Sequence, residues 1–331
     1  MQKKFILNVF ILVVASALLF FINLFFGTVK FSFGDLQNPS IANIFYEIRI
    51  PKGFTALLAG AALALAGLLM QTLFRNPLAG PYVLGISSGA SLFVAISIML
   101  VNSFGLGNYY FVGKSIITLS AIVGALLVTL VILFISKKSG SNITVLLVGI
   151  MLSQILGAFQ GLIEYLASAD SLKTFVVWGM GSVSNTTNKD LGLMLPVSGV
   201  LFFSSLFLAK PLNALLLNES YAQNLGIDVA KLRITIIVVT AILTGIITAF
   251  CGPIAFVGMS VPIACRLLFK TSNHLHQIVY CILVGACTLL FCDSVCQLLN
   301  TNFSLPINTI TTLIGSPFVI YLIFSHKRSL S

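Results

Sequence analysis

Long apolar runs separated by short polar segments dominate the chain. A transmembrane helix needs about 20 consecutive apolar residues, and about ten runs approach that length. The expected spans are 5–26, 53–74, 84–101, 115–135, 143–167, 191–209, 233–251, 254–269, 278–298 and 309–325. The runs that begin at 84 and 254 are irregular at their starts. The pattern predicts an all-α, polytopic membrane protein of about ten transmembrane helices.

One segment between two of these spans is rich in helix breakers. Residues 76–90, NPLAGPYVLGISSGA, contain two prolines and three glycines. A bilayer tolerates broken backbone only where protein or a water-filled path satisfies the freed N–H and C=O groups. We therefore expect this break to lie beside a transport route.

A similar but shorter sequence pattern recurs in the second half of the chain. Gly-Pro at 80–81 is followed by Gly-Ile-Ser at 85–87, and Gly-Pro at 252–253 by Gly-Met-Ser at 258–260. The preceding spans would run in opposite directions, which is the pattern of an inverted repeat. Gly-Pro pairs are also common at helix ends, so both interpretations stay open.

Small residues recur along the span 53–74. Ala56, Gly60 and Ala64 are four residues apart, and Ala59 and Gly67 lie on a neighbouring stripe. Small residues at this spacing let helix backbones approach closely. We expect this helix to be tightly packed at the centre of the bundle.

The composition supports a membrane protein without a soluble module. The chain is 58% hydrophobic and 8% charged, whereas soluble domains carry roughly 25% charged residues. We expect residues 1–331 to form a single transmembrane domain, with its longest polar segments at 27–52, 168–190 and 210–232.

The start of the chain resembles a signal peptide. Lys3 and Lys4 precede the first apolar run, and residues 15–17 (Ala-Ser-Ala) look like a cleavage site. The run continues to Phe26, so cleavage would leave the mature chain starting inside it. We favour an uncleaved first helix.

The orientation follows from the basic residues in short loops. The set on the side of the N-terminus is Lys3, Lys4, Arg75, Lys137, Lys138, Lys210, Lys231, Arg233, Arg266, Lys270, Lys327 and Arg328. The opposite set is Lys30, Arg49, Lys52, Lys114, Lys173 and Lys189. This bias predicts that both termini are cytoplasmic and that the net charge of +10 reflects topology rather than nucleic-acid binding.

Residues for catalysis or nucleotide binding are missing. The nearest approach to GxxxxGK[ST] has five residues between Gly107 and Gly113, and it lies in an outer loop. Cys292, Asp293 and Cys296 lack the usual four-ligand set of a metal site. We expect no enzyme activity, no cofactor and no metal in this chain.

The energy source for transport must also come from elsewhere. Only Glu164 and Asp293 are acidic residues within predicted spans, and both map toward the outer ends of their helices. An ion relay at the midplane would need such groups. The alternative function is a stand-alone secondary transporter driven by an ion gradient, and the lack of a midplane relay argues against it. A membrane-embedded enzyme is a weaker alternative. A partner on the cytoplasmic side fits better.

A candidate dock for that partner lies in the segment 210–232. Residues 218–226, NESYAQNLG, would form a short helix from Glu219 to Leu225 that Gly226 stops. Such a helix can lie in a groove of a partner protein. The alternative is a surface turn without a partner.

Several motifs together resemble one family. The chain is similar to the permease subunits of bacterial ABC importers for iron–siderophores, haem and cobalamin, the FecCD-type permeases. The resemblance covers about residues 45–325. It rests on RIPK at 49–52, NPLAGPYVLGISSGA at 76–90, NESYAQNLG at 218–226, GPIAFVGMSVP at 252–262 and SLPINTITTLIGSPF at 304–318.

The resemblance implies a type II ABC importer permease in the bacterial inner membrane. It would work as a homodimer or as paired homologues around one central path. ATP and Mg²⁺ would bind to a separate ATPase subunit, and a periplasmic or lipid-anchored binding protein would deliver the chelate. Access would alternate between the two sides of the membrane.

The resemblance also assigns roles to residues. The coupling segment that meets the ATPase would include Glu219, Ser220, Ala222, Leu225 and Gly226. Arg49 and Lys52 would meet acidic side chains of the binding protein. The gate positions would be Asn76, Leu78, Ser141, Asn142 and Ser168, with Ser168 at the outer gate.

Three positions depart from the family pattern. Ile263 stands where a histidine is common, Gln297 where a basic residue is common four positions after Asp293, and Asn308 where a glycine is usual. These departures put the strength of docking and the choice of partner in question. The identity of the chelate is not readable from this chain.

Overall fold

The computed structural model describes residues 2–25, 34, 37–103, 110–139, 141–298 and 305–327, and their regular structure is helical. The longer helices are α1 (Gln2–Phe25), α3 (Ile50–Phe74), α4 (Ile86–Ser103), α5 (Tyr110–Lys138), α6 (Asn142–Leu166), α8 (Asn188–Phe207), α11 (Val229–Cys251), α12 (Val257–Phe269), α13 (His274–Leu298) and α14 (Ile307–Lys327). The shorter ones are α2 (Pro39–Ile44), α7 (Ala169–Gly179), α9 (Ala209–Leu217) and α10 (Glu219–Asn224), with the π-helical turn Phe45–Arg49 and the 3₁₀ turn Pro81–Leu84.

The ten longer helices coincide with the ten apolar runs of the sequence. In the described part of the chain, seven segments are long and apolar enough to cross a membrane. Two more apolar helices are shorter, Ile86–Val101 and Val257–Phe269, and these follow the two irregular breaks. The prediction of an all-α, polytopic membrane protein is confirmed.

One boundary differs from the prediction. The predicted span begins at residue 53, after the polar segment 27–52, whereas α2 and the π-helical turn Phe45–Arg49 extend α3 back to Pro39. Asn38 caps this extension by accepting a hydrogen bond from the Ser40 N–H at 3.1 Å, and proline suits the first helical turn. These local signals outweigh the polarity of the segment.

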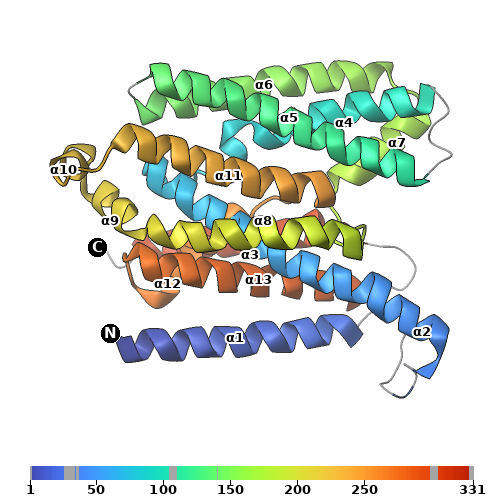
Figure 1. Ribbon diagram of the computed structural model, residues 1–331, viewed down its shortest axis with the longest axis horizontal. Helices are drawn as coiled ribbons and strands as arrows, with labels where there is room; N and C mark the ends of the chain where they lie inside the picture. The colour runs from blue at the N-terminus through green and yellow to red at the C-terminus, as the bar shows by residue number, and fades with distance from the viewer. Residues whose placement is uncertain are drawn as a thin grey trace.

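The long helices run roughly side by side in layers (Figure 1). Helices α4, α5, α6 and α7 lie on one side, and α3, α8 and α11 lie in the middle. Helices α12 and α13 come next, and α1 packs along α13 at the opposite edge. Helix α3 contacts α11, α12 and α13 and is buried along almost its whole length.

The small residues of α3 explain this central place. A Cβ atom at Gly60 would collide with the backbone of Gly285 in α13, and one at Gly67 would collide with the backbone of Gly258 in α12. Side chains of any size would therefore push α12 and α13 away from α3. The predicted tight packing of this helix is confirmed.

The two ends of the bundle differ in what they carry. The N-terminal end of α1 lies at the same end as α9 and α10, and α2 lies at the opposite end (Figure 1). The predicted topology likewise places the N-terminus and the segment 210–232 on one side. The direction of the protein in the membrane and the inverted repeat stay predictions.

Candidate functional site

The segment predicted to dock a partner forms a helical hairpin at one end of the bundle. Asn218 separates α9 from α10, and its side chain accepts a hydrogen bond from the Ser220 N–H at 3.4 Å. Gly226 stops the helix with φ +81°, a backbone conformation that glycine adopts without steric cost. The predicted short helix with a glycine stop is confirmed.

The hairpin turns apolar side chains outward. Leu217 is 68% exposed, Leu225 59%, Tyr221 46% and Leu216 42%. We call these four residues the apolar patch. Ala222 lies on the inner face of α10 and is fully buried. A group of large apolar side chains on a short polar segment is typical of a surface that another molecule covers.

Polar contacts brace the hairpin from within. The Asn142 amide donates to the Glu219 carboxylate at 2.5 Å and to the Leu73 carbonyl at 3.1 Å. Arg233 lies 4.0 Å from Glu219 and donates to the Ser139 carbonyl at 3.0 Å. Hydrogen bonds to charged groups are stronger than neutral ones. Glu219 therefore ties α10 to the adjacent ends of α3, α5, α6 and α11.

This network connects the predicted gate residues with the predicted coupling residues. Asn142, predicted as a gate residue, contacts Glu219, predicted as a coupling residue, so the structure brings both sets to one place. Ser141 lies exposed just before α6, and Ser220 is exposed on α10. Ala222, in contrast, supports α10 from inside and offers no surface to a partner.

The start of α11 is fixed directly after the hairpin. Asp228 accepts a hydrogen bond from the Lys231 N–H at 3.0 Å, and its other carboxylate oxygen lies 3.2 Å from Lys231 Nζ. The backbone N–H bond, with the side chain of Lys231 adding to it, lowers the pKa of Asp228. The carboxylate thus stays charged at neutral pH and caps the helix.

The first helix break begins at the end of α3. Arg75 is in the left-handed conformation (φ 48°) and donates to the Leu215 carbonyl of α9 at 2.9 Å. Asn76 accepts a hydrogen bond from the Leu78 N–H at 2.9 Å. Leu78 is 54% exposed and Asn76 is half-buried. These two predicted gate residues therefore lie in the turn next to the hairpin.

The remainder of this break packs against α6. A Cβ atom at Gly149 of α6 would lie 2.7 Å from the Val83 carbonyl oxygen, and one at Gly85 would lie 2.8 Å from Ser153 Oγ. Gly85 ends the 3₁₀ turn with φ +75°. The break is thus covered by protein on this side, as unpaired backbone groups in a membrane require.

The second break, residues 252–256, is held by one side chain. Asn308 accepts a hydrogen bond from the Ala255 N–H at 2.9 Å and donates to the Pro253 carbonyl at 2.7 Å and to the Gly179 carbonyl at 3.3 Å. The amide therefore satisfies two backbone groups of the break and the last carbonyl of α7. Asn308 is one of the departures from the family pattern, and the structure gives it this role.

Arg49 and Lys52, predicted to dock a binding protein, lie inside the chain at the opposite end. Arg49 is 7% exposed and donates to the Leu24 carbonyl at 2.7 Å. Lys52 Nζ lies 3.2 Å from Asp293 Oδ2, with its side chain 15% exposed. The isolated chain therefore does not present either charge on an open surface, and the docking role stays a prediction.

Asp293 is the centre of a buried polar cluster. Besides Lys52, the Asn23 and Gln297 amides each donate to Asp293 Oδ2 at 2.7 Å, and Asp293 is 4% exposed. We call these four residues the outer cluster. It joins α1, α3 and α13. Gln297 thus supports the carboxylate at the position where the family commonly has a basic residue.

Ser168 makes only local contacts among the described residues. It precedes α7, its Oγ accepts a hydrogen bond from the Ser171 N–H at 3.4 Å, and it donates to Ser171 Oγ at 3.0 Å. This is an ordinary helix cap. The outer-gate role of Ser168 stays a prediction.

Sequence reasoning missed some residues of the hairpin and breaks. Leu225 was named as a coupling residue, but Tyr221, Leu216 and Leu217 were not. Tyr221 lies one helical turn before Leu225, so the amphipathic pattern of the short helix could have revealed it. Arg233 and Asn308 act through contacts between distant parts of the sequence, and no local signal marks them.

The helical breaks inside a buried bundle, together with the hairpin, define a polytopic α-helical permease with the architecture of a type II ABC importer. The FecCD transport family matches residues 12–325, and the chain belongs to this family.

Individual relatives agree with this assignment. The hemin transport system permease protein HmuU of Yersinia pestis is 32% identical over 314 residues, covering 92% of this chain and 91% of the relative. The vitamin B12 import system permease protein BtuC of Shigella boydii is 33% identical over 302 residues, covering 91% and 90%. A solved metal-chelate type ABC transporter in an inward-facing conformation matches with a TM-score of 0.86 at 28% identity, covering 96% and 99%.

Proposed function

We propose that the chain is the permease subunit of an importer that carries a bulky metal chelate or a corrinoid inward across the bacterial inner membrane. The named relatives handle hemin and vitamin B12, which are large ring-shaped metal complexes. The subunit would span the membrane as one domain, residues 1–331, with both termini in the cytoplasm. It would provide the path, and partner subunits would provide energy and most of the selectivity.

The observation that carries this proposal is the apolar patch on the braced hairpin. Tyr221 and Leu225 stand outward on a short helix that Glu219 fixes to the transmembrane helices. A patch that is apolar outside and rigidly connected inside suits the transfer of movement from an ATPase subunit. Ser220 and Gly226 are exposed beside the patch and would contact the same partner.

The gates would lie close to this contact. Asn76 and Leu78 follow α3, and Ser141 and Asn142 begin α6, beside the hairpin. Movement of the hairpin would thus reach the inner gate directly through Asn142. Ser168, at the start of α7, would belong to the outer gate.

The outer partner would be a binding protein that delivers the chelate. We propose that it docks near Arg49 and Lys52 and that two permease subunits together enclose the path. Because Lys52 is engaged by Asp293, an incoming acidic side chain would compete with Asp293 for this ammonium group.

The test is to purify the full chain with its candidate ATPase subunit and to reconstitute both in lipid. ATP hydrolysis is then measured with and without the binding protein. We expect a stable complex whose hydrolysis responds to the binding protein, and uptake of the chelate that stops when ATP is omitted.

The opposite result would favour a transporter driven by an ion gradient. A chain that retains no ATPase subunit, and that takes up chelate when only an ion gradient is applied, would be a stand-alone secondary transporter. Uptake in both assays is measured with the same vesicles, so a loss of protein during reconstitution is recognised by the amount of inserted chain.

A further inference from the structure

A pocket of about 330 Å³ lies between α3, α9, α12 and α13 at the end of the bundle that carries the hairpin. The C-terminal end of α12 and the following turn supply most of its polar lining, namely Arg266, Lys270, Thr271 and Ser272. His274 and Gln277 of α13 also line the pocket, and the His274 ring already contacts Thr72 and Asn213. Two cations and two hydroxyl groups thus converge on one small space.

The positive charge in this pocket is not neutralised by the described residues. The Arg266 guanidinium donates to the neutral amide of Gln71. No carboxylate in the described ranges lies within 4.0 Å of Arg266 or Lys270. A partly buried cation without a counter-ion is costly, so the pocket favours an anionic ligand.

The backbone places Lys270 at this position. Lys270 ends α12 in the left-handed conformation, with φ 46° and ψ 44°. This conformation is uncommon for residues with a Cβ atom. It turns the chain into the segment 271–273, so that Lys270, Thr271 and Ser272 all line the pocket.

Gln277 holds the turn that carries the pocket's hydroxyl groups. The side chain is 2% exposed, and its Nε2 donates to the Thr271 carbonyl at 2.6 Å. Its Oε1 has no partner within the described structure. A buried acceptor without a partner costs free energy. This atom is buried, so the two cations and the two hydroxyl groups determine which ligand fits the pocket.

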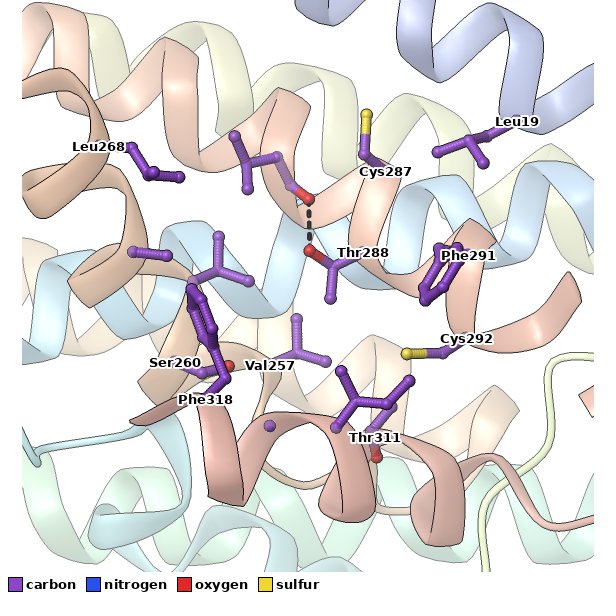
Figure 2. A pocket seen from close by; sticks show the side chains of 15 residues that line it. Leu19, Val257, Ser260, Leu268, Cys287, Thr288, Phe291, Cys292, Thr311 and Phe318 are labelled. Carbon is purple, nitrogen blue, oxygen red and sulfur yellow. Dashed lines mark hydrogen bonds between the residues drawn. The ribbon is translucent and has the colours of Figure 1, made fainter. Parts of the chain in front are cut away.

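A second cavity shows the contrast. About 350 Å³ lie between α1, α12, α13 and α14, lined mainly by apolar side chains (Figure 2). Its hydroxyl groups are already used, because Thr288 donates to the Val284 carbonyl at 2.7 Å and Ser260 to the Phe256 carbonyl at 2.8 Å. This cavity offers no unsatisfied polar group, whereas the basic pocket does.

We propose that the basic pocket, lined by Arg266, Lys270, Thr271 and Ser272, binds a phosphate group. Arg266 and Lys270 would contact the anionic oxygens, as these side chains do in other phosphate sites. The hydroxyl groups of Thr271 and Ser272 would donate to the same oxygens. Two sources have this chemistry: free phosphate, and the headgroup of an anionic phospholipid.

The position of the pocket connects it to the hairpin. Leu216, one of the four residues of the apolar patch, also lines this pocket. A bound phosphate would therefore contact the base of the hairpin. The binding itself does not depend on the transport function and is tested without it.

The experiment measures ligand binding to the purified full chain in detergent. Thermal unfolding is followed at rising inorganic phosphate, with chloride at equal ionic strength as the reference. Native mass spectrometry after extraction from phosphatidylglycerol or phosphatidylcholine bilayers records retained lipid. We expect stabilisation by phosphate, selective retention of phosphatidylglycerol, or both.

The variants assign the binding to this pocket. Lys270→Gln removes one exposed cation and should weaken phosphate or lipid binding about tenfold. Lys270→Arg should retain it. Lys137→Gln removes an exposed cation at the end of α5 and should leave binding within about twofold. Arg266→Gln should also weaken binding, and its folding is checked by size-exclusion chromatography.

Each outcome decides the proposal. Phosphate-dependent stabilisation that Lys270→Gln abolishes supports a free phosphate, and lipid retention that Lys270→Gln abolishes supports a headgroup. The proposal is overturned if wild-type protein responds to neither ligand. It is equally overturned if Lys270→Gln and Lys137→Gln bind alike.

Discussion

The two ends of the bundle use charged residues in similar ways but present different surfaces. At the hairpin end, Glu219 joins Asn142 and Arg233 beneath an exposed apolar patch. At the opposite end, Asp293 and Lys52 form the ion pair of the outer cluster, with side chains 5% and 15% exposed. In both places the ionic groups hold helices together. Exposed apolar side chains beside the outer cluster, such as Ile22 and Leu298, lie on the long apolar helices α1 and α13, whereas those of the hairpin lie on a short polar segment.

The comparison distinguishes two roles of charged residues that a sequence alone does not distinguish. A charged residue in a connecting segment can meet a partner, or it can fix the chain's own elements. Surface ion pairs contribute little, whereas breaking a buried pair is costly. The outer cluster should therefore matter mainly for stability, and the patch mainly for binding a partner.

The largest effect should come from separating the outer pair. Asp293→Ala leaves Lys52 buried without a counter-ion and should lower the free energy of unfolding by about 3 kcal/mol. Lys52→Ala should cost a similar amount. The double variant should cost clearly less than the sum, because each single change strands the other group.

Reversible unfolding in detergent measures all three variants. Additive losses would mean that the two groups do not interact. The Lys52–Asp293 pair would then not be what stabilises this end of the bundle.

The next effect should appear in partner affinity. Leu225→Arg places a charge in the apolar patch and should weaken binding of the ATPase subunit at least about 30-fold, as for a central interface residue. Stability should change by no more than about 0.5 kcal/mol, because Leu225 is exposed.

Asn224→Arg is the matched control, since it adds the same charge at a neighbouring exposed position. The affinity of the ATPase subunit is measured by its binding to permease chain immobilised on a sensor surface. If both variants lose the same affinity for the ATPase subunit, the added charge alone explains the effect. The apolar patch would then not be the binding surface.

The smallest effect should come from the brace beneath the patch. Glu219→Gln keeps the shape of the side chain but removes the charge that Asn142 and Arg233 share, at a cost of about 1 kcal/mol. Amide hydrogen exchange in 219–226 should become about fivefold faster. Ser220→Ala, an exposed neighbour, should leave these rates unchanged, and unchanged rates in Glu219→Gln would show that the brace does not fix the hairpin.

Most of the fold could be predicted from local sequence signals. The apolar runs located the ten longer helices because the bilayer demands uninterrupted apolar length. The small residues Gly60 and Gly67 marked the central helix because close packing excludes side chains. The sequence marks 27–52 only as a polar segment and does not predict the helix at 39–44, where Asn38 supplies a cap.

The site was only partly predictable for a different reason. The glycine stop at Gly226 and the break after Asn76 depend on local backbone preference, and the sequence reveals both. The pairing of Lys52 with Asp293, or of Asn308 with Pro253, depends on contacts between distant segments. A charge can be read from a sequence, but its burial and its partner cannot.

The contacts of Gly60 with Gly285 and of Gly67 with Gly258 have a mechanical consequence. Where helices touch backbone to backbone, no layer of side chains lies between them that could repack in a second arrangement. Helices α3, α12 and α13 should therefore move as one rigid body. Any change of access during a transport cycle would take place around this block, at contacts where side chains can exchange neighbours.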